Sequence, residues 1–270
     1  MPSSVLYSVD GGVGTLVLNR PERLNAFDGP MALEVLAALD EAAGDPAVRS
    51  LIFTGSGRGF CAGGDLGALE AGGRARAEGS ERLPAPRAQA AAIRAMERTT
   101  ELLHEMPKVT IAAVNGPCAG AGLSWACAAD VRIASTSAVF TTAFLRAGQT
   151  GDYGATWLLP RLLGAARARE LLLLSGRIDA AEAERIGLVS RVLADEDLMD
   201  GARSIAESVS AFAPLAVAAM KANLTDAEAG TLSETLDHEA RRMVEGSATR
   251  DSREAVAAFR EGRAPVFEGR

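Results

Sequence analysis

Short apolar runs recur along the first two thirds of the chain, and segments with the spacing of amphipathic helices separate most of them. Such runs are typical of buried β-strands. They predict strands at Val13–Leu18, Val48–Thr54, Val109–Val114, Val131–Ala134 and Ala138–Thr142. Because strands and helices alternate up to about Val192, with loosely recurring units of two strands and one helix, the pattern predicts an α/β fold.

The first predicted helix begins after Asp28, a residue type that caps helix N-termini, and Pro30 falls in its first turn. Gly44 would end this helix. Its predicted apolar stripe consists of Leu33, Leu36, Leu39 and Ala43. A stripe with this spacing covers one face of a helix.

Beyond about residue 195 the pattern changes to helices alone, one of them at Leu215–Asn223. Two capping-box patterns predict further helix starts, at Thr231 with Glu234 and at Asp251 with Glu254. The pattern therefore predicts two regions, a core at residues 1–195 and a helical C-terminal region at residues 196–270.

Composition narrows the possible partners. The chain has 270 residues, with 28 Lys and Arg against 35 Asp and Glu, and a formal net charge of −7. Nucleic-acid binding without sequence preference needs clustered positive charge, which releases counterions from phosphates. The chain has no basic run, which argues against this class of binding, and any phosphorylated partner must be bound by a local cation.

The longest run without charge, Val109–Ala129, is interrupted by an Asn-Gly-Pro sequence at residues 115–117. We therefore interpret it as strand, turn and helix, and expect no membrane span. The three cysteines lack the spacing of metal ligands, and Met1–Asp10 has neither the basic start nor the apolar stretch of a secretory leader. These features predict a cytoplasmic protein without a metal site.

Histidine is scarce, because only His104 and His238 are present. Most serine, cysteine and zinc hydrolases need a histidine as base or metal ligand. These mechanisms are therefore disfavoured, and we expect both histidines on helix surfaces.

Two glycine-rich turns, Ala62–Asp65 and Ala119–Gly122, each follow an apolar strand. Either turn alone is explained by a tight connection that needs positive φ. The second fails as a dinucleotide-binding motif, because Trp125 stands where a small residue is needed. As a pair, the turns could aim one backbone amide each at a common oxygen, which is how an oxyanion hole is built.

Five stretches resemble the enoyl-CoA hydratase/isomerase (crotonase) family, in the same order and over nearly the whole chain. They are Asn19–Phe27, Gly57–Leu66, Lys108–Leu123, Ala181–Val192 and Arg253–Phe267. The resemblance implies a crotonase-like α/β fold with a ββα spiral core and a C-terminal helical region for trimerisation, in a homotrimer or a dimer of trimers. It also implies an acyl-CoA thioester as substrate, with no cofactor other than the coenzyme A of the substrate.

The resemblance implies roles for individual residues. The amides of Gly64 and Ala121 would form the oxyanion hole. Binding of substrate and coenzyme A is expected at Arg23, Leu24, Ala26, Ala62, Gly63, Asp65, Leu66, Gly120, Phe144 and Trp157. Arg23 would supply the local cation for phosphate, although a solvated turn residue is the alternative interpretation.

The chain departs from the family's hydratases at two positions, where Ser124 and Phe144 stand in place of glutamates. Asp152 is the acid that remains in the catalytic stretch. Its surroundings resemble the branch that contains the ring-epoxide isomerase of phenylacetyl-CoA breakdown, in which an Asp at this position handles the proton. From the residues alone, Asp152 could equally be a helix N-cap.

We therefore expect Asp152 to be the single acid/base of a double-bond isomerase, with hydration as a close second. If Phe144, Tyr153 and Trp157 surround Asp152, burial would raise its pKa toward the working range. One alternative is a homologue that binds acyl-CoA without catalysis. Another is a dehalogenase-like hydrolase of an aryl-CoA, although the helper histidine of that enzyme would align with Glu97.

Overall fold

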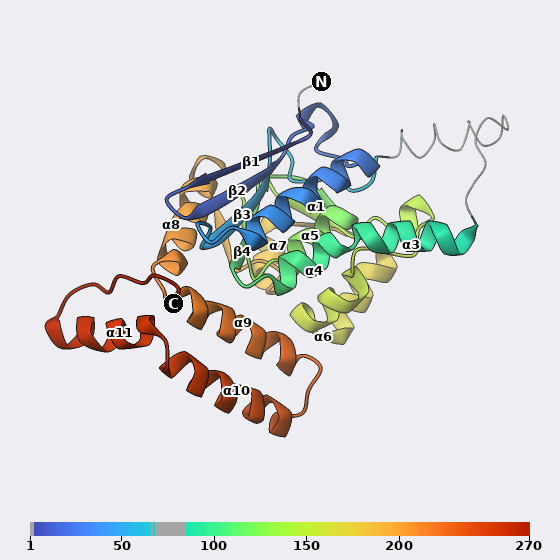
Figure 1. Ribbon diagram of the computed structural model, residues 1–270. Helices are drawn as coiled ribbons and strands as arrows, with labels where there is room; N and C mark the ends of the chain where they lie inside the picture. The colour runs from blue at the N-terminus through green and yellow to red at the C-terminus, as the bar shows by residue number, and fades with distance from the viewer. Residues whose placement is uncertain (1–2, 66, 68–84) are drawn as a thin grey trace.

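The computed structural model describes residues 3–65, 67 and 85–270. Within these residues the main sheet has six strands in the order β1–β2–β3–β4–β6–β9, with β1 and β2 antiparallel and all other neighbours parallel (Figure 1). The strands are β1 (Val5–Asp10), β2 (Val13–Leu18), β3 (Ser50–Gly55), β4 (Val109–Val114), β6 (Val131–Ser135) and β9 (Arg191–Leu193). A second sheet in the described part of the chain consists of β5 (Cys118–Ala119), β7 (Val139–Thr141) and β8 (Arg177–Asp179). The predicted α/β fold is confirmed.

The strand predictions succeeded where the apolar run was long. β2 and β4 have the predicted bounds, and β3, β6 and β7 differ from theirs by one or two residues at the ends. Four strands were not predicted. Val5 is the one buried residue of β1, which lies at the sheet edge, and β5, β8 and β9 are two or three residues long. Neither kind of segment carries a period that a pattern search detects.

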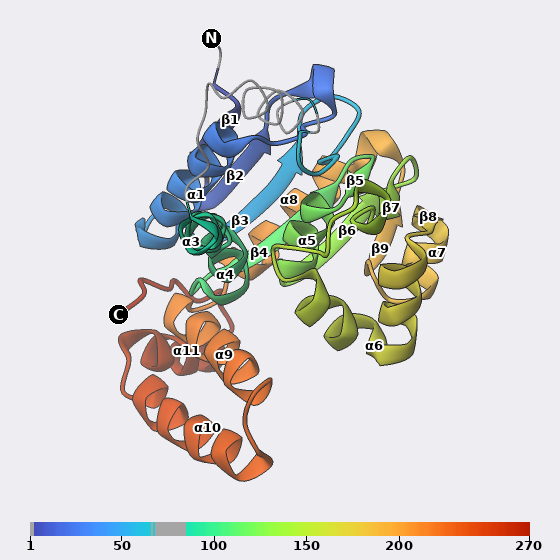
Figure 2. The ribbon, with the colours of Figure 1, turned by 90° about the vertical axis from the view of Figure 1, so that its right-hand side faces the viewer.

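Helices cover both faces of the main sheet (Figure 2). On one face lie α1 (Gly29–Gly44), α4 (Arg98–Glu105) and α5 (Ala121–Ala128), and on the other lies α8 (Leu198–Ser210). α3 (Pro86–Met96) contacts α1 and α4 and has no buried residue. Phe53 of β3 belongs to the larger apolar core on the first face, whereas Ile52 packs with Ala202 of α8. Strands buried on both faces appear in sequence as continuous apolar runs.

α1 begins where it was predicted, because the Asp28 side chain accepts a hydrogen bond from the Met31 amide at 3.0 Å. The predicted apolar stripe was wrong in part, since Leu33 is 59% exposed. The buried residues of α1 are Met31, Ala32, Val35, Ala38, Leu39 and Ala42. Apolar residues lie all around this helix, so the spacing alone did not determine which face meets the core.

The C-terminal helices α9 (Pro214–Ala227), α10 (Leu232–Ser247) and α11 (Arg250–Glu261) extend away from the main sheet, with α9 and α10 side by side (Figures 1 and 2). The capping box at Thr231 is confirmed, because its hydroxyl accepts from the Glu234 amide while the Glu234 carboxylate accepts from the Thr231 amide. The second capping box was wrong. Thr249 caps α11, and the buried Asp251 instead accepts hydrogen bonds from two backbone amides of the C-terminal tail.

The remaining elements connect these layers. They are the helices α6 (Ala155–Leu174) and α7 (Ala180–Arg185) and the 3-10 turns η1 (Pro21–Arg23), η2 (Leu145–Ala147) and η3 (Asp195–Asp197). α8 follows the predicted boundary at residue 195 and packs on the sheet. The division into two regions stays a prediction.

Among the described residues, no single helix is long and apolar enough to cross a membrane. One bent pair of helical segments, Asp195–Ser210 and Pro214–Ala227, passes the test together by length and composition only, with an angle of 104° between the two.

Candidate active site

A cavity of about 430 Å³ lies between the two glycine turns, α3 and the segment before α6. Gly64, Ala121 and Asp152, the three predicted catalytic groups, all line it. The other lining residues are Phe27, Asp28, Gly29, Ala62, Gly63, Asp65, Ile93, Met96, Gly120, Ala143, Phe144, Ala147, Gln149 and Tyr153. The fold therefore brings together groups that are far apart in the sequence.

The first glycine turn pairs with Phe27 in a parallel bridge. The Phe27 amide donates to the Gly63 carbonyl at 2.9 Å, and the Asp65 amide donates to the Phe27 carbonyl at 2.8 Å. Because neighbouring peptide groups of an extended segment alternate in direction, the amide of Gly64 points away from this pairing. Among the described residues it has no hydrogen-bond partner, so it is free to donate.

The second glycine turn leads into α5. Gly120 has a φ of 53°, and its amide donates to the Thr141 carbonyl at 3.2 Å. Ala121 is the first residue of the helix, and its amide has no partner among the described residues. Amides in the first turn of a helix lack an intrahelical acceptor and lie at the positive end of the helix dipole. Both properties favour an anionic oxygen in the cavity.

The two turns are packed against each other through their backbones. The Ala119 amide donates to the Cys61 carbonyl at 2.9 Å, and Cys61 forms a parallel bridge with Cys118. A Cβ on Gly122 would lie 2.5 Å from the Cys61 carbonyl oxygen. Glycine at position 122 is therefore required by close approach, and the relative position of the two turns is set by main-chain contacts.

Asp152 lies in the segment before α6, between Gly151 and Tyr153, which have φ values of 102° and 49°. The N-cap of α6 is Gly154, so the interpretation of Asp152 as the helix cap was wrong. The Asp152 side chain faces the cavity and has no hydrogen-bond or ion-pair partner among the described residues. Although Asp152 is exposed to solvent at the cavity, desolvation by the surrounding protein, followed by the nearby Glu97 carboxylate, raises its pKa from 3.8 to about 6.

The aromatic residues around Asp152 do not all behave as predicted. Phe144 is 8% exposed and lines the cavity, and Tyr153 is buried. Trp157 does not line it, and its role in substrate binding stays a prediction. Its ring lies under the Arg161 guanidinium, at 3.8 Å, and against His104, because the first turn of α6 directs residue 157 toward α4.

The comparisons with known proteins agree with this geometry. Residues 8–270 match the family described as enoyl-CoA hydratase/isomerase. The chain is 37% identical over 270 residues to the 1,2-epoxyphenylacetyl-CoA isomerase of Escherichia coli (strain K12), covering 100% of both chains. This protein belongs to the enoyl-CoA hydratase/isomerase family.

Solved structures of the crotonase family have the same fold. An enoyl-CoA hydratase from Polaromonas sp. JS666 is 34% identical with a TM-score of 0.89, and the match covers 98% of this chain and 99% of that one. An enoyl-CoA hydratase from Bacillus anthracis is 29% identical with a TM-score of 0.90, covering 99% and 100%. The crotonase-like fold is thereby confirmed, and the protein is an enzyme of the hydratase/isomerase type.

The structure shows what Ser124 and Phe144, the two departures from the family's hydratases, do at the cavity. The Ser124 hydroxyl is buried and donates to the Asp152 carbonyl oxygen at 3.1 Å. Phe144 presents an apolar ring to the cavity. The nearby Glu97 accepts a hydrogen bond from the Tyr153 amide at 3.2 Å and does not line the cavity. Asp152 is therefore the acid of this catalytic stretch that faces the cavity.

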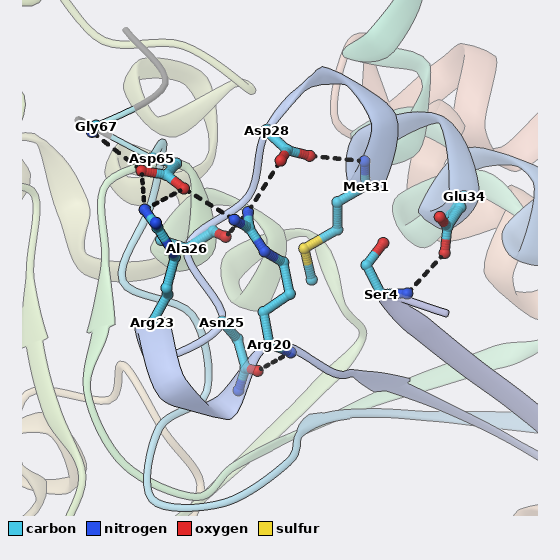
Figure 3. A network of polar contacts seen from close by, with 10 residues as sticks. All are labelled: Ser4, Arg20, Arg23, Asn25, Ala26, Asp28, Met31, Glu34, Asp65 and Gly67. Atoms are coloured by element: carbon cyan, nitrogen blue, oxygen red, sulfur yellow. Dashed lines mark hydrogen bonds and ion pairs between the residues drawn. The ribbon is translucent and has the colours of Figure 1, made fainter. Parts of the chain in front are cut away.

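A network of arginines and carboxylates lies beside the first glycine turn (Figure 3). Asp65 is 6% exposed and pairs with Arg23 at 3.1 Å and with Arg20 at 2.9 Å. Arg20 also pairs with Asp28 at 3.2 Å. Sequence reasoning missed Arg20, whose partner Asp65 lies 45 residues away. Arg23 is half exposed, so it can offer hydrogen bonds outward as well as to Asp65.

The predicted coenzyme A residues of η1 and the following turn lie next to the cavity without lining it. The Ala62 amide donates to the Leu24 carbonyl at 3.0 Å, and the Ala26 carbonyl accepts from Arg20 at 2.7 Å. Leu66 lies outside the described residues. Within the described residues no three His, Cys, Asp or Glu side chains are grouped to hold a metal ion. The expectation of no metal and no separate cofactor stays a prediction.

Proposed function

We propose that this enzyme moves a double bond in an enoyl-CoA thioester by proton transfer. The observation that carries the proposal is that one carboxylate with a raised pKa lines the same cavity as two free backbone amides. The coarser function, a crotonase-family enzyme of the hydratase/isomerase type, is given by the family itself.

The chemistry needs one base and one anion site. The Gly64 and Ala121 amides would bind the thioester oxygen and stabilise the enolate that forms when a carbon next to the carbonyl, or conjugated with it, loses its proton. Asp152 would take that proton and return it to another carbon of the acyl chain, so that no atom is gained or lost. A carboxyl group with a pKa near 6 exchanges a proton more readily near neutral pH than one with an ordinary pKa.

Hydration is the second candidate. It requires a water activated at the β carbon and a proton delivered at the α carbon, which two carboxylates at the cavity perform best. In the part of the cavity near Asp152, Ser124 is engaged with a backbone carbonyl and Phe144 is apolar. Asp28 and Asp65 also line the cavity, but both are paired with Arg20. Asp152 is the cavity acid with a raised pKa, and one such acid favours isomerisation over hydration.

Arg23, the first glycine turn and α5 would take the coenzyme A moiety and the thioester, and the apolar wall formed by Ile93, Met96 and Phe144 would take the acyl chain. The homotrimer or dimer of trimers and the cytoplasmic location stay predictions. So do the two alternatives, a homologue that binds acyl-CoA without turnover and an aryl-CoA hydrolase.

The test is incubation of the purified protein with 3-enoyl-CoA and, separately, with 2-enoyl-CoA, monitored by the absorbance of the conjugated thioester and by mass spectrometry. We expect the 3-enoyl thioester to gain conjugation without a change in mass. Addition of water without movement of the double bond would contradict the proposal in favour of a hydratase. Release of free coenzyme A would favour the hydrolase, and binding without turnover would favour the inactive homologue.

A further inference from the structure

The peptide group between Asp152 and Tyr153 is held at both of its polar atoms by side chains from other elements. The Ser124 hydroxyl of α5 donates to the Asp152 carbonyl oxygen at 3.1 Å. The Tyr153 amide donates to the Glu97 carboxylate at 3.2 Å, and Glu97 lies at the junction of α3 and α4. We refer to Ser124 and Glu97 as the peptide clamp.

Contacts from outside the segment are needed because its backbone is strained. Tyr153 has a φ of 49°, a left-handed conformation that residues other than glycine rarely adopt. The strain of such a conformation costs about 1–3 kcal/mol. Thr100 of α4 adds a third contact by donating to the Tyr153 carbonyl at 3.1 Å. The Tyr153 ring also packs against Phe27 and Trp125, with 5.4 Å between centroids in each pair.

The Asp152 carboxylate has no partner of its own among the described residues, so the direction of its side chain depends on the backbone from which it projects. We infer that the peptide clamp, Glu97 and Ser124, positions the Asp152 carboxylate in the cavity, an inference that rests on the function proposed above. Both are positioning residues, since neither lines the cavity. They hold the two ends of the same peptide group and differ in charge.

That difference separates their effects. Around Asp152, the charged groups that line the cavity are Asp28 and Asp65, both paired with Arg20. From the α3–α4 side comes Glu97, whose negative charge raises the pKa of Asp152. The adjacent Tyr153 hydroxyl, whose ordinary pKa of 10.0 is raised further by burial, is uncharged near neutral pH. Ser124 holds the peptide without affecting the charge balance.

The experiment compares E97Q, E97A and S124A by the pH profile of the isomerisation rate. E97Q keeps an oxygen that accepts the Tyr153 hydrogen bond and removes the charge. We expect the apparent pKa on the acid side of its rate profile to fall below the wild-type value of about 6, because the negative charge beside Asp152 is gone. Its plateau rate should fall less than that of E97A, which also loses the hydrogen bond. S124A removes the hydrogen bond to the Asp152 carbonyl, together with a longer one to the Gly120 carbonyl at 3.4 Å, and removes no charge. Its plateau rate should fall by about 10- to 100-fold, as for a displaced catalytic group, with the apparent pKa unmoved.

A second readout does not depend on turnover. Carboxyl 13C NMR of the labelled protein, with the Asp152 signal assigned by its loss in D152N, follows the protonation of Asp152 directly. If the peptide clamp is correct, E97Q shifts this titration to lower pH, even if the true reaction is hydration or hydrolysis. Thermal unfolding shows whether each variant remains folded.

The outcomes distinguish the two proposals. The peptide clamp is overturned if the Asp152 titration is the same in wild type and E97Q, or if folded E97A and S124A keep the full plateau rate of whichever thioester reaction the wild type performs. If the wild type moves no double bond while E97Q still shifts the titration, the proposed function fails and the inference about Glu97 stands.

Discussion

The two sides of the cavity are built in different ways. On one side, the turns at Gly64 and Ala121 contribute main-chain amides, and backbone contacts fix their separation. On the other side, Asp152 contributes a side chain from a strained segment that side chains of α4, α5 and the α3–α4 junction hold in place. The first arrangement depends on glycine at a few positions, and the second on several polar contacts between distant residues.

This difference separates what is general in the site from what is particular to the reaction. Any thioester enolate needs a pair of donors at its oxygen, and backbone donors tolerate changes of side chain as long as the turns keep their shape. Which carbon gains or loses the proton depends on where an acid is placed. Under the function proposed above, reaction choice in this enzyme is set on the Asp152 side.

The largest expected effect comes from removing the acid. D152N should lower the isomerisation rate by about 10²- to 10⁴-fold, the usual contribution of a positioned general base. Binding of a non-reactive acyl-CoA, measured by calorimetry, should persist because the backbone donors remain. Full activity of D152N would show that the two sides of the cavity are not divided in this way.

A disturbance of the backbone side should affect both stability and rate. In G122A the new methyl group would lie 2.5 Å from the Cys61 carbonyl oxygen, and such overpacking costs about 1–3 kcal/mol of the free energy of unfolding. Displacement of the Ala121 amide should lower the rate by up to about 10²-fold.

G64A is the matched control for stability in this comparison. A Cβ at position 64 meets no atom within 4 Å, so the free energy of unfolding should not decrease. Chemical denaturation of both variants measures the difference. Equal stability of G122A and wild type would contradict the close approach of the two turns.

A smaller effect is expected beside the cavity. Arg23 is half exposed and already paired with Asp65, so R23Q should raise the KM for an acyl-CoA by about 2- to 5-fold, the range of an exposed ion pair, with kcat little changed. R161Q, an arginine outside the cavity, is the control and should leave KM unaltered. A KM for R23Q equal to that of R161Q would remove Arg23 from substrate binding.

The smallest effect is on stability as a function of pH. The folded-state pKa of Asp152, about 6, is above the value near 3.9 expected in the unfolded chain. Folding therefore favours the protonated form, and the contribution of Asp152 to stability should decrease as pH rises from about 4 to about 6, then stay level. Denaturation of wild type and D152N across this range gives the contribution as a difference. A difference that increases with pH would mean that the carboxylate is stabilised in the cavity.

Sequence reasoning predicted the parts of the molecule that depend on local chemistry. Fully buried strands and the two glycine turns leave a local signature in apolar runs and glycine spacing. The face of α1 and the direction of Trp157 could not be predicted, since both depend on what packs against a helix. The contact between Glu97 and Tyr153 joins residues 56 positions apart, and no local pattern reports such a distance.

The close approach of Gly122 to Cys61 also limits how this enzyme can be redesigned. A library that aims at bulkier acyl groups gains nothing from varying Gly122, where an added methyl group distorts the scaffold. Room is better created at Ile93, Met96 and Ala147, whose side chains line the cavity outside the glycine turns and the Asp152 segment. Selectivity could then be tuned by truncation at those three positions while the reactive geometry stays untouched.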